Sequence, residues 1–361
     1  MKRHPYDGLP RYANWRRALV GVPPADVDPV VSFPFKLSAT DRIATAGSCF
    51  AQHIARHLRR RGYNYFCTEA AHPMLSAEQA QQYNYGTFSA RYGNLYTARQ
   101  LLQLFQRAHG QFSPADEAWQ EADGTWLDPL RPQIQPGGFA SLRELQADRR
   151  AHLAAVRKLF AELDVFIFTL GLTETWRARS DGTVYPVCPG VSGGVFSAEQ
   201  HEFHNYTHEE VVADMLAFID ALRSVNPRAR VILTVSPVPL MATAEDRHVL
   251  VSTTLSKAVL RVACDSIIKA REEVAYFPSY EIITGAYTRG SYYADDLRSV
   301  TEPGVAHVMK LFLKHATDRP AQQAPVPAQN PAPAQSDAHL ARSAHLVEVN
   351  CDETALDDGT D

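Results

Sequence analysis

The chain of 361 residues has few cysteines, no long apolar run and no excess of positive charge. No window approaches the roughly 18 to 20 uninterrupted apolar residues of a membrane span, and the N-terminal segment lacks the apolar stretch of a signal peptide. The cysteines are too scattered for a disulfide framework or a zinc knuckle. They are Cys49, Cys67, Cys188, Cys264 and Cys351. We therefore expect a cytoplasmic protein with reduced thiols.

The formal net charge of −4 gives no electrostatic reason to expect nucleic acid or an anionic membrane as a partner. A glycine-rich loop that could cradle phosphate is also missing, so no nucleotide, nicotinamide or flavin cofactor is predicted. What is present is an ordinary globular composition, 45% hydrophobic and 21% charged. A chain of this length can bury a substantial core.

Short apolar runs rich in β-branched residues predict the strands of a buried sheet. The runs are 42–46, 63–66, 164–171, 230–237 and 274–283. Segments with helical spacing of apolar residues lie between and after them. These are 49–61, 140–162, 207–225, 252–271 and 302–316. Strands that alternate with helices predict an α/β fold with a parallel sheet and helices on both faces.

The chain divides into an N-terminal arm (1–40), a central domain (41–317) and a Pro/Ala-rich segment (318–361). Two insertions, 67–139 and 172–204, follow strands at the carboxyl edge of the sheet. Ligands of open parallel sheets bind at that edge, so we expect the insertions to form the walls of a pocket. The last segment predicts a disordered linker with an acidic tail, which is either solvated or a docking peptide for a partner.

Gly47, Ser48 and Cys49 stand where a predicted strand gives way to a helix. A serine at this junction places its hydroxyl near backbone N–H groups and the positive end of the helix dipole, which suits a nucleophile with an oxyanion site. Serine is also a common helix cap, so this position alone is weak evidence. We interpret Cys49 as a packing residue; the alternative is a thiolate stabilised by the helix N-terminus.

Residues 47–51 read GSCFA, and the chain resembles the GSCFA family, which is grouped with the SGNH (GDSL-like) hydrolases. The resemblance covers about residues 40 to 316 and continues, in order, through four more motifs. They are TLG at 169–171, TVSPV at 234–238, LSKAVL at 255–260 and FPSYEII at 277–283. The resemblance implies a flavodoxin-like α/β/α sandwich with a mostly parallel five-stranded sheet. It also implies ester hydrolysis or acyl transfer with Ser48 as the nucleophile.

The resemblance further implies a histidine base and its aspartate in an Asp-x-x-His segment before the last helix. Asp296 matches the aspartate, but Ser299 stands at the histidine position. We favour His248, in the loop after the 230–237 strand, as the base, with Asp296 as its orienter. A structural role in the loop is the alternative for His248, and His307 is the second candidate base.

Oxyanion donors are expected from the Ser48 N–H, a loop glycine and an asparagine. Gly86 is the best match to the glycine, Thr173 stands where the asparagine is expected, and Asn94 could supply the missing amide. Because the loss of one such donor typically costs about 2.7 to 4 kcal/mol, a compensating donor is expected in a fast enzyme. Lys257 belongs to the recognised pattern, but its role is left open.

The sequence thus predicts an SGNH-type serine esterase or O-acyltransferase that acts on an ester of a glycan or small metabolite, without a cofactor. Because the expected histidine is missing, the alternative is a degenerate SGNH fold that serves as a non-catalytic binding or assembly module. His201, His204 and His208 lack a supporting carboxylate pattern, so no metal site is predicted. Tyrosines and tryptophan in the insertions suit either stacking on a sugar or anchoring of the insertions.

Overall fold

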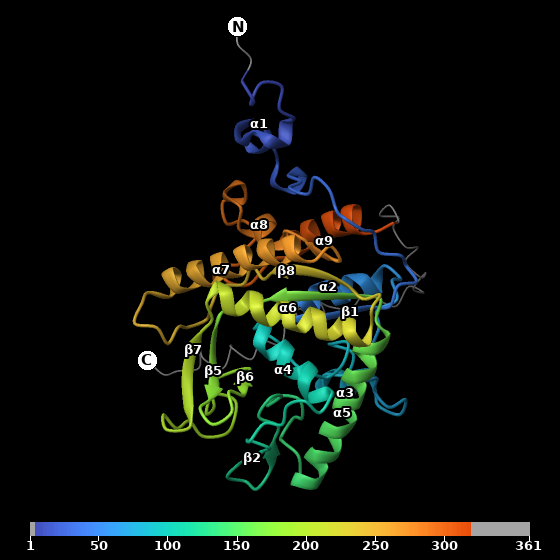
Figure 1. Ribbon diagram of the computed structural model, residues 1–361, viewed down its shortest axis with the longest axis vertical. Coiled ribbons are helices and arrows are strands. Elements are labelled where there is room, and N and C mark those ends of the chain that lie inside the picture. The colour runs from blue at the N-terminus through green and yellow to red at the C-terminus, as the bar shows by residue number, and fades with distance from the viewer. Residues whose placement is uncertain (1–3, 319–361) are drawn as a thin grey trace, which may run out of the picture.

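A computed structural model of the protein describes residues 4–318. Within this range a parallel sheet forms the centre of the molecule, with its strands in the order β1-β4-β8-β9 (Figure 1). Its strands are β1 (Ile43–Gly47), β4 (Val165–Leu170), β8 (Arg230–Val235) and β9 (Val274–Tyr276). Gly47 pairs with Thr169, and Thr169 pairs with Thr234, so the carboxyl ends of the first three strands lie side by side.

Helices cover both faces of this sheet, as the alternating pattern predicts. One face packs against α2 (Phe50–Arg60), α8 (Ser279–Thr284) and α9 (Glu302–Ala316). The other face packs against α4 (Ala98–Ala108), α5 (Leu142–Glu162), α6 (His208–Val225) and α7 (Val249–Ala270). Neighbouring side chains of β4 point to opposite faces, so Ile167 joins the first core and Phe168 the second. The expected α/β architecture with helices on both faces is confirmed.

The sheet has four strands where five were expected. Residues 63–66 form only an isolated parallel bridge, between Ile43 and Tyr65. The next ladder position on β1 is already occupied, because the backbone N–H of Thr45 donates to Ser89 Oγ at 3.0 Å and its carbonyl accepts from the Tyr92 hydroxyl. Side chains of the first insertion therefore replace the fifth strand.

The last predicted strand is also shorter than expected. The run 274–283 is extended only at 274–276, and α8 begins at Ser279 directly after Pro278. Proline has no backbone N–H for a ladder hydrogen bond, so it ends the strand. The remaining apolar residues of the run, Ile282 and Ile283, are buried from the helix instead.

Both insertions have secondary structure of their own. The first contains α3 (Ala77–Gln82), α4 and a short antiparallel pair of β2 (Trp119–Gln120) and β3 (Trp126–Leu127). The second contributes a separate antiparallel sheet in the order β6-β5-β7. Its strands are β5 (Glu174–Ala178), β6 (Val184–Tyr185) and β7 (His201–Asn205). The α4 helix was not among the helices predicted from the sequence, although its capping box of Thr97 and Gln100 is a recognisable N-terminal signal.

The N-terminal arm changes character along its length. The α1 helix (Trp15–Leu19) stands away from the rest of the molecule (Figure 1). Val30 and Leu37 are buried in the core beneath α9, and the Leu37 N–H donates to the Ala316 carbonyl at 2.7 Å. Within residues 4–318 no helix is both long and apolar enough to cross a membrane. The predicted linker and acidic tail, beyond residue 318, lie outside the described residues.

Candidate active site

The end of β1 approaches β4 so closely that only glycine fits there. Gly47 has φ +136°, and a Cβ atom on it would lie 2.3 Å from the Thr169 carbonyl oxygen. The next residue, Ser48, donates its backbone N–H to the same carbonyl at 3.2 Å, and α2 begins two residues later. This geometry holds Ser48 at the carboxyl edge of the sheet and at the start of a helix.

The Ser48 side chain is enclosed. The residue is 3% exposed, and its Oγ has no hydrogen-bond partner among the described residues. Gly171, just past β4, packs against it: a Cβ on Gly171 would lie 3.0 Å from Ser48 Cβ and 3.2 Å from the Tyr96 ring. A small residue at 171 is therefore required to leave space for the serine.

Other hydroxyl groups without a partner lie along the same edge of the sheet. Thr169, Thr234 and Ser279 stand at or just beyond the ends of β4, β8 and β9, and each has a buried side-chain oxygen with no hydrogen bond to a described residue. The hydroxyl of Thr173, which follows β4, is likewise buried and has no hydrogen bond to a described residue. Buried polar groups are normally satisfied, so such a row marks this edge as a place for a polar ligand.

Asn94 is fastened beside Ser48. The N–H of the following residue, Leu95, donates to the Gly47 carbonyl at 2.9 Å, and Gln52 Nε2 donates to Asn94 Oδ1 at 3.4 Å. Gln52 lies on the first turn of α2, so strand, helix and insertion meet at this asparagine. The structure therefore brings Asn94, a predicted oxyanion donor, to the predicted nucleophile.

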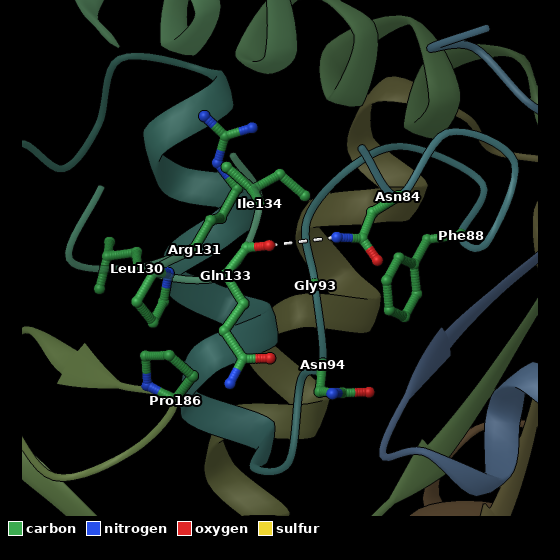
Figure 2. Close-up of a pocket in the computed structure, with 10 residues that line it drawn as sticks. Asn84, Phe88, Gly93, Asn94, Leu130, Arg131, Gln133, Ile134 and Pro186 are labelled. Carbon is green, nitrogen blue, oxygen red and sulfur yellow. Dashed lines mark hydrogen bonds between the residues drawn. The ribbon is translucent and has the colours of Figure 1, made fainter. Parts of the chain in front are cut away.

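A cavity adjoins Asn94 on the side of the first insertion. Figure 2 shows Gly93 and Asn94 on one wall facing residues 130–134 on the other, with Asn84 donating to the Gln133 carbonyl at 3.1 Å. Phe88 adds an apolar surface. The lining residues of this cavity come almost entirely from the first insertion, and Pro186 comes from the second.

Lys257 enters the same region from α7. It is only 2% exposed, and its Nζ donates to the Gly171 carbonyl at 2.6 Å. The preceding residue, Ser256, accepts a hydrogen bond from the Thr173 N–H at 3.0 Å. The α7 helix thus holds Gly171 and Thr173, in the segment that packs on Ser48, by hydrogen bonds. It also brings the amine of Lys257 to that segment.

The structure does not bring His248 to Ser48. His248 is exposed and caps α7, where its Nδ1 accepts from the Leu250 N–H at 3.1 Å. Ser256, which reaches the sheet edge, is eight residues further along, so at 1.5 Å per residue His248 lies about 12 Å beyond it on the helix axis. The helix starts at Val249 rather than at the predicted residue 252, and this places the histidine at its outer end.

Asp296 and His307 are also apart from the serine. Both carboxylate oxygens of Asp296 serve its own turn: they accept from the backbone N–H groups of Arg298 and Ser299, and from Ser299 Oγ at 2.5 Å. His307 is buried within α9 and its Nδ1 lies 2.9 Å from the Tyr292 hydroxyl. A Ser-His-Asp arrangement from these residues is not assembled in this structure.

Gly86 lies at the opposite end of α2 from Ser48. Its carbonyl accepts a hydrogen bond from Arg59, which is eleven residues, or about 16 Å of helix, away from the serine. The oxyanion role predicted for Gly86 therefore has no support in the geometry. Gly93, with φ +74° and directly before Asn94, is the insertion glycine at the site. Its place next to the asparagine was a signal that the sequence offered.

Two further predictions concern sulfur and metal ligands. Cys49 is buried, at the N-cap position of α2. His204 contacts Glu210 at 2.9 Å, whereas His208 contacts Ser266 at 3.0 Å, so these two histidines have different partners. Over residues 4–318 no group of three His, Cys, Asp or Glu side chains is arranged to hold a metal ion.

Comparisons with known proteins give one family and, among the structures that match, a distant one. The latter is the crystal structure of a serine-to-alanine mutant of an acetyl esterase with acetate ion. It is 14% identical, with a TM-score of 0.24, and the match covers 42% of this chain and 59% of that chain, less than two thirds of its length. At this TM-score the match carries no structural argument. No curated protein matches. The model of the GSCFA family matches residues 42–312, about three quarters of the chain. The protein therefore belongs to the GSCFA family.

Proposed function

We propose that the protein is an SGNH-type serine hydrolase or O-acyltransferase that acts on ester bonds, with Ser48 as its nucleophile. The observation that carries this proposal is the position of Ser48: a buried hydroxyl without a partner, at the junction of a parallel strand and a helix. A hydroxyl that makes no other hydrogen bond is available to a substrate carbonyl and to a base.

The surroundings of Ser48 supply groups for a developing oxyanion. Its own N–H is engaged by the Thr169 carbonyl, so other donors are needed. The amide of Asn94 and the unpartnered hydroxyl of Thr173 are the candidate hydrogen-bond donors to the oxyanion. The positive end of the α2 dipole also favours negative charge at this position. This assignment keeps Asn94 and Thr173, the two residues considered for the expected asparagine, and leaves out the Ser48 N–H and Gly86.

His248 and Lys257 are the two candidates for the general base that activates Ser48. For His248, with Asp296 as its orienter, the loop 236–248 would have to carry the imidazole inward by about 12 Å along α7. Lys257 needs no such movement, because it already contacts the Gly171 segment that packs on the serine. A buried lysine is readily deprotonated, so it can serve as a general base.

The cavity beside Asn94 limits what the site encloses. Its lining mixes apolar side chains, such as Phe88 and Ile134, with the amides of Asn84 and Asn94, and its room of about 20 Å³ takes only one small group, such as a short acyl group. The ester of a glycan or small metabolite is therefore proposed from the family resemblance, with only its acyl end in this cavity. Trp176 packs edge-on against Phe196 and Phe203, which favours an anchoring role for this insertion aromatic over a stacking role.

The test is labelling of the purified protein with a fluorophosphonate probe, followed by mapping of the modified residue. We expect modification at Ser48, its loss in Ser48→Ala, and normal labelling in Ser224→Ala, an exposed serine on α6. Labelling at another residue, or equal labelling of Ser48→Ala, would refute the nucleophile.

A second candidate function is a non-catalytic binding module. The specific observation in its favour is that neither His248 nor Asp296 contacts Ser48, while Ser299 takes the histidine position and satisfies Asp296. This candidate predicts that the folded protein resists the fluorophosphonate probe, yet that ester or glycan ligands raise its melting temperature. Turnover of any ester that depends on Ser48 would exclude it.

A further inference from the structure

A second polar region is buried between α4, α5 and the segment 128–134. It holds a network of ion pairs among side chains that are mostly inaccessible. Arg131 bridges Asp128 at 2.9 Å and Asp148 at 2.8 Å, and Arg91 contacts Asp148 at 2.8 Å. Three further contacts complete it: Arg149 with Asp128, Arg91 with Glu69, and His152 with Glu69.

Positive charge exceeds negative charge in this network. Asp128, Asp148 and Glu69 face four arginines, of which the fourth, Arg107, projects from α4. His152 adds no charge at neutral pH, because burial and the Arg131 charge lower its pKa to about 4. The network therefore has four guanidiniums and three ion-paired carboxylates, and Asp116 and Glu117 lie close by in the wall of the cavity that Arg107 and Arg149 line.

Arg107 is the unmatched residue. It is 8% exposed, and its guanidinium has no hydrogen-bond or ion-pair partner within residues 4–318. Burial, together with the Arg131 and Arg149 charges, lowers its pKa to about 10 despite the attraction of Asp128. The guanidinium nitrogens are not among the fully enclosed atoms that lack a partner, so they are reached from the cavities that Arg107 lines and can bind an acceptor from outside the chain.

Two more unmatched groups line the same cavity as Arg107. Nε2 of His152 is buried and unpaired, because Nδ1 is the atom that contacts Glu69 Oε2, at 2.7 Å. The Oε1 atom of Gln100 is used by the N–H groups of Tyr96 and Thr97, whereas no described residue accepts from its Nε2. The cavity thus offers a charged donor, a neutral donor and an imidazole acceptor.

The inner cavity shares two lining residues with a more open cavity. It has room of about 20 Å³, enough for one small group. Arg107 and Leu130 also line an outer, more open cavity of about 370 Å³, which takes an organic molecule. Arg149 and Arg150 lie in the outer wall together with Asp116 and Glu117. Arg107 therefore lines both cavities.

We propose that Arg107 is the anchor of a binding site for an anionic oxygen group, a carboxylate or a phosphate, carried by a small molecule. Arg107 and Gln100 donate hydrogen bonds to the anionic oxygens, and His152 Nε2 accepts a hydrogen bond from a hydroxyl of the ligand. The body of the molecule occupies the outer cavity. The anion supplies a charged acceptor for Arg107, which has no hydrogen-bond acceptor within residues 4–318; a water molecule would supply no charge.

The site does not depend on the proposed esterase function. The three residues proposed to hold the anion come from α4 and α5, and none of them is Ser48, Asn94, Thr173 or Lys257; the lining of the inner cavity also includes Tyr92, Leu95 and Val184. A failure of fluorophosphonate labelling would therefore not contradict the anion site. A failure of anion binding would likewise not contradict the role of Ser48.

Thermal unfolding of the full chain in sodium acetate, sodium phosphate or sodium chloride, at matched ionic strength, tests the proposal. At about 10 mM acetate or phosphate we expect the wild-type melting temperature to rise by about 2 °C or more relative to chloride. Whichever of the two salts acts at lower concentration identifies the group as carboxylate or phosphate. The exposed Arg143→Met on α5 is the matched control and should behave as wild type.

The variant Arg107→Met separates binding from structure. Without added anion it should melt at or above the wild-type temperature, since it removes an unmatched buried charge, and it should not respond to acetate or phosphate. An equal response of wild type and Arg107→Met, a response to chloride as large as to the oxyanions, or no response of the wild type would overturn the proposal. Destabilisation of Arg107→Met in plain buffer would assign Arg107 a structural role instead.

Discussion

At the residue scale, Lys257 carries an ionisable amine into the interior of the protein. The side chain lies on α7, is almost fully buried, and ends at the carbonyl of Gly171, the residue that packs on Ser48. Burial of a charge is unfavourable unless a function or a partner compensates for it. A catalytic role beside the proposed nucleophile, Ser48, would compensate for the burial of the Lys257 amine.

Lys257→Met tests this reason, because methionine keeps most of the aliphatic length and removes the amine. We expect the rate of fluorophosphonate labelling of Ser48 to fall by about tenfold or more, the range in which loss of a base or an electrostatic group lies. Lys269→Met, at an exposed ion pair on the same helix, should label normally. The rate is measured against pH, since a base adds an ionisation to the profile and a structural lysine does not. Wild-type labelling of Lys257→Met would assign the lysine to structure alone.

The sequence could locate Ser48 but not its partners. Gly47 and Ser48 are recognisable because a strand, a glycine and a helix follow one another within a few residues. Gly86 and His248 failed as contacts of Ser48 because their positions depend on tertiary structure: the path of an insertion and the length by which α7 extends beyond the sheet. A residue in a long loop has no position that local pattern can fix.

At the element scale, the loop between β8 and α7 covers the sheet edge. Leu240 from this loop forms a small apolar cluster with Tyr96 and Leu172, and the Tyr96 ring adjoins Gly171 beside Ser48. The Leu240 N–H is fixed to Thr253 Oγ1 at 3.0 Å. We therefore expect this cluster to restrict access to the buried serine from the side of the loop.

Leu240→Ala should loosen the cover. We expect Ser48 to be labelled several-fold faster, while the free energy of unfolding falls by about 2 kcal/mol, the low end for a buried leucine truncation. Labelling kinetics and urea denaturation measure the two effects. Leu250→Ala, at an exposed leucine of α7, should change neither. A labelling rate that stays at the wild-type value in Leu240→Ala would show that the cluster is not the barrier.

The elements themselves were largely readable. Buried strands are short, continuous apolar runs, and α5, α6, α7 and α9 have long amphipathic patterns, so their existence and type followed from sequence. The strand expected at 63–66 failed because Ser89 and Tyr92, distant in sequence, occupy the ladder positions of β1. Such competition between a side chain and a strand is invisible to a local pattern.

At the scale of the whole molecule, several histidines are buried in an uncharged state. Burial, with nearby arginine charges, lowers the pKa of His53 to about 3 and that of His152 to about 4. The pKa values of His57 and His307 are also lowered, mainly by burial. Folding therefore excludes protons from groups that titrate near pH 6.5 in the unfolded chain.

The sign of the pH dependence follows from proton binding. Below about pH 6.5 the unfolded chain binds more protons at these histidines than the folded protein, so stability falls as pH falls, until the folded pKa values near 4 and 3 are reached. Each buried histidine contributes at most about 1.4 kcal/mol per pH unit. The lowered pKa values of Glu69 and Asp128 act in the same direction at lower pH, while the raised pKa values of Glu174 and Asp214 oppose it.

We therefore expect the free energy of unfolding to decrease steadily between about pH 6.5 and pH 4.5, and His152→Gln to reduce that slope. Glutamine does not titrate, and it can still donate a hydrogen bond to Glu69, so the variant removes the proton-linked part of the contact alone. Urea denaturation at several pH values measures the slope, and His4→Gln, at an exposed histidine, should leave it unchanged. A flat profile in the wild type would show that the buried histidines gain protons without unfolding. An unaltered slope in His152→Gln would assign the pH dependence to the other histidines with lowered pKa values. These are His53 and His57 on α2 and His307 on α9, which are not part of the arginine network.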